Sequence, residues 1–424
     1  MSQLLVNLSI LFSQPTGIAN YAANLFPYLK PLDPTLLISP TASSRFCSAT
    51  PYTCYPIPGN LSPEQGTKGH FRRLLWTQFQ LPRISKKLRT HLLFSPVPEA
   101  PLFTNCRYVV MVHDLIGLRF PQGFSPLTTY QRYYIPQVLA QAEHIICNSK
   151  ATARDLTDFF KIPAAKITPV LLAYDAKQYY YQDLRKCPLN PPNLDLPNLG
   201  DFDIITPQNW GAGGQNQLNF VSPNYLNTVD GEKHGENREN CPYFLYIGRP
   251  DPHKNLHRLI EAFAALPNCQ DYQLWIAGAT DKRYTPLLEA QAEELDISSQ
   301  VKFLGYVPQH QLPTMIRNAI AFVFPSLWEG FGIPVLEAMA CGTPVITANL
   351  SSLPEVAGDA AILINPYNPE EITAAMAAVA TDSQMRSHLR QSGLARASEF
   401  SWQKTGQATV EILSYIVKGI GNRE

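Results

Sequence analysis

Two glutamates, Glu329 and Glu337, lie eight positions apart around a Gly-Phe-Gly turn in the segment PSLWEGFGIPVLEAMACGTPVIT. A helix that begins directly after a strand leaves its first backbone N–H groups unpaired and presents the positive end of its dipole to a ligand. The donors at this helix start would be Gly330, Phe331, Gly332 and Ile333. Carboxylates accept hydrogen bonds from paired hydroxyls. The segment therefore predicts a site for an anion or a hydroxyl-rich ligand such as a sugar.

The surrounding pattern supplies the elements that would hold this site. Residues 321–324 form an apolar run typical of a buried strand, Pro334 suits the first position of a helix, and Gly342 would end that helix. A second strand is expected over 343–347. A pair of glutamates alone would more simply be a solvated loop charge and a helix charge. The complete strand-turn-helix-strand order favours the ligand site over that alternative.

At these residues the sequence resembles the donor-sugar signature of the family 4 retaining glycosyltransferases, in which two glutamates with this spacing face a nucleotide sugar. The resemblance implies that Glu337 contacts the nucleotide ribose. It also implies that Glu329 and the backbone amides of residues 330–332 contact the hydroxyls of the donor sugar. Similarity to the family is strongest over 243–366 and covers most of the chain.

A second chemical motif is YFLYIGRPDPHKNLHRLIEAFAAL, where Arg249 and Lys254 lie between an expected strand at 243–247 and a helix. Loops at the carboxyl edge of parallel strands usually bind the ligand, and two cations there can hold a diphosphate. The alternative is a pair of ordinary surface cations. The family resemblance favours the first interpretation and implies that both residues neutralise a departing pyrophosphate. His253 and His257 have the spacing of a zinc pair but no third ligand in the motif, so no metal is expected.

The first half of the chain contributes weaker signals. Gly17 follows an expected strand over 2–10, and a glycine at such a turn allows close approach to a phosphate. His113 and Asp114 end an apolar strand at 107–114; a lone histidine there is more often structural. The resemblance implies that Gly17 faces the diphosphate and that His113 lies near the reacting carbon of the donor sugar. Ser149 is expected to act mainly as a helix cap.

The fold class predicted is α/β, with two doubly wound Rossmann-like domains facing across a cleft, as in the B-type glycosyltransferases. The acceptor-binding domain is expected over 1–172 and the nucleotide-sugar domain over 241–400. A final helix at 401–424 resembles the family's last helix, which packs back on the first domain. Residues 173–240 form a linker whose Asn-, Pro- and Gly-rich insertion is predicted to be largely disordered. The glycines at 211–214 lack the flanking strand and helix of a dinucleotide loop.

Composition excludes some classes. The formal net charge is zero, which gives no sign of nucleic-acid binding, and eight scattered cysteines without a CxxC pair are typical of a reduced protein. No apolar run is long enough to span a bilayer. The expected location is the cytoplasm, with a peripheral position at the inner face of the membrane as an alternative. That contact would use Lys68 to Arg89, although an ordinary amphipathic helix with solvated cations is the favoured interpretation of this stretch.

The resulting hypothesis is a retaining glycosyltransferase that needs no metal or other cofactor. Its donor would be a nucleoside-diphosphate sugar, with a weak preference for a guanosine-linked mannose. Its acceptor would be a glycan or lipid-linked hydroxyl. The alternatives are a sugar-nucleotide epimerase or glycan phosphorylase of the same architecture, and a scaffold without activity. A nicotinamide oxidoreductase is disfavoured because no glycine-rich fingerprint follows the first strand.

Overall fold

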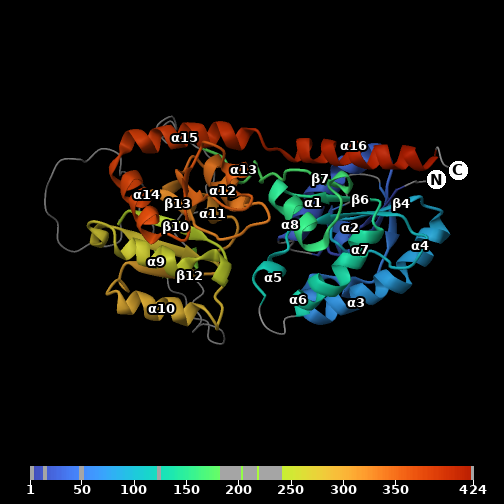
Figure 1. Cartoon of the computed structure of the whole chain (residues 1–424), viewed down its shortest axis with the longest axis horizontal. Helices are drawn as coiled ribbons and strands as arrows, with labels where there is room; N and C mark the ends of the chain where they lie inside the picture. Colours follow the sequence, from blue (N-terminus) through green and yellow to red (C-terminus); the bar gives the residue numbers. More distant parts are fainter. Residues whose placement is uncertain are drawn as a thin grey trace. The chain divides into compact units, whose positions relative to one another are not determined.

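The computed structural model describes residues 4–12, 17–46, 52–121, 126–181, 202–203, 217–218 and 241–421 (Figure 1). The chain divides into two compact units. The first comprises Met1–Ala173, Glu329–Phe331 and Phe400–Glu424, and the second comprises Tyr174–Trp328 and Gly332–Glu399. Most of the predicted insertion, including residues 211–214, lies outside the described residues.

The first unit contains a seven-stranded parallel sheet in the order β3-β2-β1-β4-β5-β6-β7. Its strands are β1 (Leu4–Asn7), β2 (Thr35–Ile38), β3 (Thr53–Pro56), β4 (Leu92–Ser95), β5 (Tyr108–Val112), β6 (His144–Cys147) and β7 (Ile167–Pro169). The central strands are continuous buried apolar runs, as expected where helices cover both faces of a sheet. The edge strand β3 is largely exposed, and no strand was predicted there.

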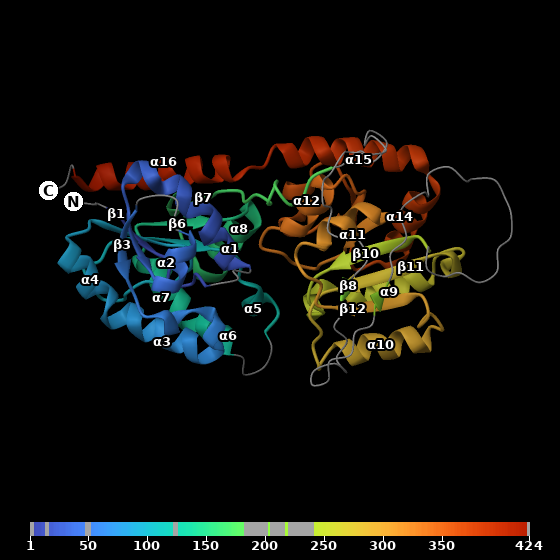
Figure 2. The same cartoon turned by 180° about the vertical axis from the view of Figure 1, so that it is seen from behind.

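Two groups of helices enclose this sheet. The apolar core on one face includes residues of α3 (Gly66–Phe79), α4 (Leu81–Leu88), α7 (Ile135–Gln141) and α8 (Lys150–Phe160). Helix α16 (Trp402–Gly421) contacts α1 (Ile18–Leu25) and the 3-10 helix η1 (Phe26–Leu32). Figures 1 and 2 show α16 and α3 on opposite sides of the sheet. The remaining helices are α2 (Pro40–Phe46), α5 (Ile116–Arg119) and α6 (Pro126–Thr129), with the π-helix η4 (Tyr130–Tyr134) and the 3-10 helices η2 (Gly59–Leu61), η3 (Pro63–Gln65) and η5 (Ala164–Lys166).

The second unit contains a six-stranded parallel sheet in the order β12-β11-β10-β13-β14-β15. Its strands are β10 (Tyr243–Ile247), β11 (Gln273–Ala277), β12 (Val301–Gly305), β13 (Ala321–Phe324), β14 (Val345–Ala348) and β15 (Ile362–Ile364). This strand order is that of a doubly wound Rossmann fold, whose ligands bind where the order reverses. The reversal lies between β10 and β13, the two strands that precede the motifs predicted to bind the donor.

The helices of the second unit form two groups. One group comprises α9 (Leu256–Ala264), α10 (Thr285–Glu294) and α14 (Pro369–Thr381), in which α9 contacts the other two. The other group comprises α11 (Leu312–Asn318), α12 (Ile333–Ala340), α13 (Leu353–Ala357) and α15 (Ser383–Ser398), in which α12 contacts the other three. Two short 3-10 helices, η9 (Pro252–Lys254) and η10 (Cys269–Asp271), precede α9 and β11, and the two-residue strands β8 (Phe202–Asp203) and β9 (Gln217–Leu218) pair antiparallel. None of the helices that the structure describes is both long and apolar enough to cross a membrane.

The predicted fold class is confirmed, since both sheets are entirely parallel among the described strands and each is covered by helices. Pro334 occupies the second rather than the first position of α12, which begins at Ile333. Gly342 follows the C-cap residue Cys341 of that helix with a φ of 76°, a left-handed conformation that suits glycine at a helix end.

Candidate active site

In the first unit, His113 follows β5 directly and is only 8% exposed. Its Nε2 lies 3.0 Å from the carbonyl oxygen of Pro96. A carbonyl oxygen can only accept a hydrogen bond, so Nε2 carries the proton and Nδ1 is left as an acceptor. Burial lowers the pKa of His113 to about 4, against the smaller opposite effect of the Pro96 hydrogen bond. The ring is therefore a neutral imidazole at neutral pH. It packs edge-on against the ring of Tyr21, with 4.8 Å between the two ring centroids.

The segment Glu329–Phe331 belongs to this unit and packs against His113. A Cβ built on Gly330 would lie only 2.2 Å from the backbone oxygen of His113, so no larger residue fits at position 330 without a backbone shift. The hydroxyl of Ser149 donates to the carbonyl of Gly330 at 2.6 Å and also accepts from Thr152 N at 3.0 Å. Ser149 thus caps α8, as predicted, and in addition holds the glycine turn, a role that the sequence did not indicate.

The other residues predicted in this unit differ in their exposure and contacts. Gly17 is exposed and is the N-cap residue of α1, while residues 13–16 of the predicted turn lie outside the described residues. Glu329 is buried, and the ring of Phe331 packs edge-on against Phe400 at 6.2 Å. Asp114 accepts a hydrogen bond from the backbone N–H of Ile116 at 3.1 Å, which holds the loop between β5 and α5.

Two polar residues at the carboxyl edge of the first sheet were not predicted as site residues. Asn7 ends β1 and Ser95 ends β4, and both are fully buried. Asn7 Nδ2 and Ser95 Oγ have no hydrogen-bond partner in the part of the chain that the structure describes. Buried polar groups usually have a partner, so these two atoms are candidates to meet water or a bound hydroxyl. A strand that changes from apolar to polar at its last residue is the sequence signal that could have identified both.

In the second unit, Arg249 follows β10 and its side chain is 60% exposed. The guanidinium lies 3.6 Å from Asp251 Oδ2 and 3.5 Å from Asp281 Oδ2. Exposed ion pairs of this length contribute little to stability, so the guanidinium can exchange these partners for a more highly charged one such as a diphosphate.

Lys254 lies on the same loop and is held more firmly. Its Nζ is 5.5 Å from the centre of the Phe324 ring, at the end of β13. The next residue, Asn255, is fully buried and donates from Nδ2 to the carbonyls of Pro325 at 3.1 Å and Pro366 at 2.7 Å. The backbone of Leu327 also donates to the His253 carbonyl at 2.7 Å. The loop after β10 is therefore joined directly to the loop after β13.

The start of α12 follows that second loop. Gly332 is its N-cap residue with a φ of 107°, a conformation that favours glycine. Ile333 is the first residue of the helix and Glu337 lies one turn further on. Removal from water raises the pKa of Glu337 to about 8, with a hydrogen bond from Tyr179 acting in the opposite direction. Tyr179, which is almost fully buried, precedes the undescribed part of the linker and was not predicted to approach this carboxylate.

Within each unit, the structure thus brings together part of the predicted set. The second unit contains Arg249 and Lys254 in the loop after β10, and Gly332, Ile333 and Glu337 at the start of α12, which follows β13. The first unit gathers His113 with the segment Glu329–Phe331 and contains Gly17. Of the histidines considered as a zinc pair, His253 is buried and His257 is exposed. The described residues contain no group of three or more His, Cys, Asp or Glu side chains arranged to hold a metal ion.

Comparison with known proteins supports the predicted family. The family model described as Glycosyltransferase Family 4 matches residues 15–177, and the model described as Glycosyl transferases group 1 matches residues 230–396. The O-antigen chain mannosyltransferase B of Escherichia coli is 38% identical over 173 residues, which are 40% of this chain and 44% of the relative. The aligned part therefore spans less than half of that relative's own length.

Two further proteins resemble this chain over most of its length. The O-antigen chain mannosyltransferase RfbU of Salmonella typhimurium is 23% identical over 368 residues, covering 86% of this chain and 87% of the relative. The crystal structure of Anabaena Alr3699/HepE with UDP and glucose matches with a TM-score of 0.65 at 18% identity, covering 98% of this chain and all of that one. This structural likeness concerns the fold. The two family models match one segment in each of the two Rossmann-like parts of the chain, and the chain belongs to the family 4 glycosyltransferases of the B-type fold.

Proposed function

We propose that this protein is a retaining glycosyltransferase that moves a sugar from a nucleoside-diphosphate sugar to a hydroxyl of a glycan or lipid-linked acceptor. The observation that carries the proposal is the linkage of the Lys254 loop to the loop after β13, through the Asn255–Pro325 and Leu327–His253 hydrogen bonds. A cation on a loop that is joined to the loop leading into a helix start is suited to a diphosphate. The mannosyltransferases among the relatives support mannose as the sugar, and a guanosine-linked donor is the specific hypothesis.

In the proposed reaction, the bond between the anomeric carbon and the diphosphate oxygen breaks, and the acceptor oxygen bonds to the same face of that carbon. The acceptor proton passes to the departing phosphate. Arg249 and Lys254 stabilise the negative charge that grows on the diphosphate, a role that many other folds give to a divalent metal. Glu337 binds the nucleotide ribose, while Glu329 and the amides of residues 330–332 bind the sugar hydroxyls. The neutral His113 ring lies near the reacting carbon.

A thermal-shift screen against a panel of nucleotide sugars tests this proposal. A ligand that binds only the folded state at 100 times its Kd stabilises that state by about 2.7 kcal/mol. We expect one nucleoside-diphosphate sugar, with GDP-mannose first among them, to raise Tm by several degrees. A flat response to every nucleotide sugar would contradict the proposal. Incubation of the bound donor without acceptor then separates the alternatives, because an epimerase would release epimerised donor and a phosphorylase would need phosphate.

We also propose that the acceptor is met at an anionic membrane surface through α3 and α4. Phe71, Leu75 and Phe79 recur every four residues along α3 and are 61%, 45% and 62% exposed. The stretch from Lys68 to Arg89 contains seven Lys or Arg residues and no Asp or Glu, in a chain of zero net charge. Trp76 and Arg73 are buried, so only part of the apolar and basic set is available at the surface. An exposed apolar row beside cations is typical of an interfacial helix.

Changing Phe71, Leu75 and Phe79 together to serine is expected to reduce binding to vesicles containing about one third phosphatidylglycerol by roughly tenfold or more, since each buried aromatic or leucine side chain contributes on the order of 1.5–3 kcal/mol. Vesicle co-sedimentation measures this. Leu287, which is 66% exposed on α10, provides a control through Leu287→Ser, which should leave binding unchanged. Equal binding to purely zwitterionic vesicles, or full binding by the triple variant, would rule out this surface.

A further inference from the structure

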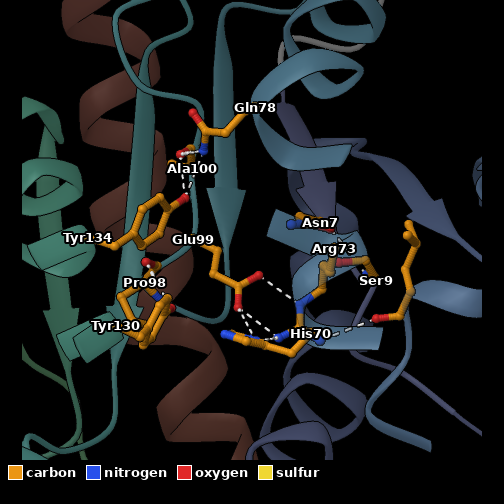
Figure 3. Close-up of polar contacts among 11 residues, drawn as sticks. Asn7, Ser9, His70, Arg73, Gln78, Pro98, Glu99, Ala100, Tyr130 and Tyr134 are labelled. Atoms are coloured by element: carbon orange, nitrogen blue, oxygen red, sulfur yellow. Dashed lines mark hydrogen bonds and ion pairs between the residues drawn. The ribbon is translucent and has the colours of Figure 1, made fainter. Parts of the chain in front are cut away.

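A buried ion pair lies beneath α3 in the first unit. Arg73 donates from Nε to Glu99 Oε2 and from Nη2 to Glu99 Oε1, both at 2.7 Å (Figure 3). The guanidinium also donates to the Leu61 carbonyl at 3.3 Å and to His70 Nδ1 at 2.9 Å. Arg73 is 6% exposed and Glu99 is 2% exposed. Both carboxylate oxygens of Glu99 therefore accept hydrogen bonds from one side chain of α3.

Glu99 belongs to the segment Pro96–Ala100, which continues from β4. The carbonyls on either side of Glu99 are held as well, as Figure 3 shows. Tyr130 donates to Pro98 O at 3.3 Å, and Tyr134 donates to Ala100 O at 2.9 Å. Gln78 donates from Nε2 to the same Ala100 carbonyl at 3.0 Å. Three successive residues after β4 are thus fixed by side chains from α3 and η4.

The first residue of this segment holds the histidine of the proposed reaction. Pro96 offers its carbonyl to His113 Nε2 at 3.0 Å, which determines the tautomer of the ring. Proline has no backbone N–H with which to join the sheet, so it contributes no ladder hydrogen bond of its own. Ser95 of β4, which pairs with Val110, fixes the chain before Pro96, and the contacts of Pro98, Glu99 and Ala100 fix it afterwards. The position of the Pro96 carbonyl therefore depends on both sides, and on the second side the Arg73–Glu99 pair joins two charged groups.

The energetics of the pair suggest that stability alone does not explain it. Removing two charges from water is costly, and apolar side chains of similar volume often give equal or greater stability at such a position. Two parallel hydrogen bonds between a guanidinium and a carboxylate fix a geometry as well as an energy. A bidentate pair is therefore well suited to holding a loop in one position.

We propose that Arg73 and Glu99 are positioning residues for His113: through the segment Pro96–Ala100 they hold the Pro96 carbonyl where it keeps the imidazole in its Nε2–H tautomer, with Nδ1 free to accept. The inference rests on the proposed role of His113 in sugar transfer. Neither residue of the pair touches the donor in this proposal. Their effect is exerted through the ring orientation and protonated nitrogen of His113.

The double variant Arg73→Met/Glu99→Leu tests the proposal, because it replaces the pair with apolar side chains of similar volume and leaves no unpaired buried charge. We expect Tm to change by only a few degrees and the Kd for the donor to stay within about threefold of wild type. We expect kcat to fall roughly tenfold or more, since small displacements of a reacting group are costly. With selective ¹⁵N labelling of histidine, the His113 signal, assigned by its loss in His113→Gln, should change from a single Nε2–H tautomer to a mixture.

A second variant and a control keep the test decisive. Arg73→Lys keeps the two opposite charges but loses the second of the parallel hydrogen bonds. Its kcat and tautomer ratio should therefore shift in the same direction as those of the double variant, and it gives this answer even if the double variant folds poorly. The partly exposed pair Arg107–Glu143, with a 2.7 Å contact in the same unit, provides the control Arg107→Gln/Glu143→Gln, which should match wild type. Wild-type kcat and a single Nε2–H tautomer in the variants of the Arg73–Glu99 pair would overturn the inference. The tautomer measurement needs no turnover, so it gives its answer even if the proposed sugar transfer is itself wrong.

Discussion

Replacing Lys254 with alanine is expected to lower kcat by about 100-fold or more while the Kd for the donor rises only a few-fold. The ammonium group meets its strongest partner in the transition state, when negative charge gathers on the departing diphosphate, and a contact that strengthens on the way to the transition state acts on turnover more than on binding. Isothermal titration with the nucleotide sugar and steady-state kinetics measure the two quantities separately.

Lys302 supplies the matched control for this substitution. It is an exposed lysine on the edge strand β12 of the same unit, so Lys302→Ala removes an equal charge away from the loop after β10. Its kcat and Kd should equal those of wild type. If Lys254→Ala lowered donor affinity and kcat by similar factors, the lysine would bind the ground state of the donor as strongly as the transition state. The proposed role would then be wrong.

Substituting alanine for Gly330 is expected to abolish most of the activity, with kcat lowered by about 100-fold, because displacing a reacting group by about 1 Å can cost that much. The added Cβ would meet the backbone oxygen of His113 at 2.2 Å and Asp114 Cβ at 3.1 Å, and neither can move without shifting the end of β5. Overpacking of this kind also costs about 1–3 kcal/mol of stability. Thermal unfolding and kinetics on the purified variant measure both effects.

Gly59 offers the comparison for this prediction. A Cβ at Gly59 has no neighbour within 4 Å, and its φ is not in the left-handed region. Gly59→Ala should therefore leave kcat and Tm unchanged. If Gly330→Ala behaved in the same way, the close approach between the glycine turn and His113 would not exist in the protein in solution.

The sequence predicted strands at 243–247 and 321–324, and these are the bounds of β10 and β13 in the structure. Buried parallel strands read as continuous apolar runs bounded by turn residues, and this signal is local. Strand β3 was missed for the same reason, because most of its residues are exposed and one is proline, so no apolar run marks it. Edge strands lack the burial that makes central strands recognisable.

In helix α3 the periodic pattern of the sequence was insufficient to predict which residues face the sheet. Its mixture of cations and apolar residues was compatible with an ordinary amphipathic helix, and that interpretation was favoured. Which residues face the sheet depends on how the helix is rotated about its axis. The structure buries Arg73 and Trp76 and exposes Phe71, Leu75 and Phe79. An arginine takes an inner position there because Glu99, from a distant part of the chain, supplies its counter-charge.

The sequence by itself determined the fold class, the two strand-turn-helix motifs and the residue types that could bind a nucleotide sugar, since each depends on neighbours within about ten to twenty positions. Only the tertiary structure decided which loops meet. Ser149 holds the Gly330 carbonyl across 181 positions, Asn255 joins the loops after β10 and β13, and the tautomer of His113 is set by Pro96. Such contacts depend on the close packing of separate elements, which no local pattern of residues encodes.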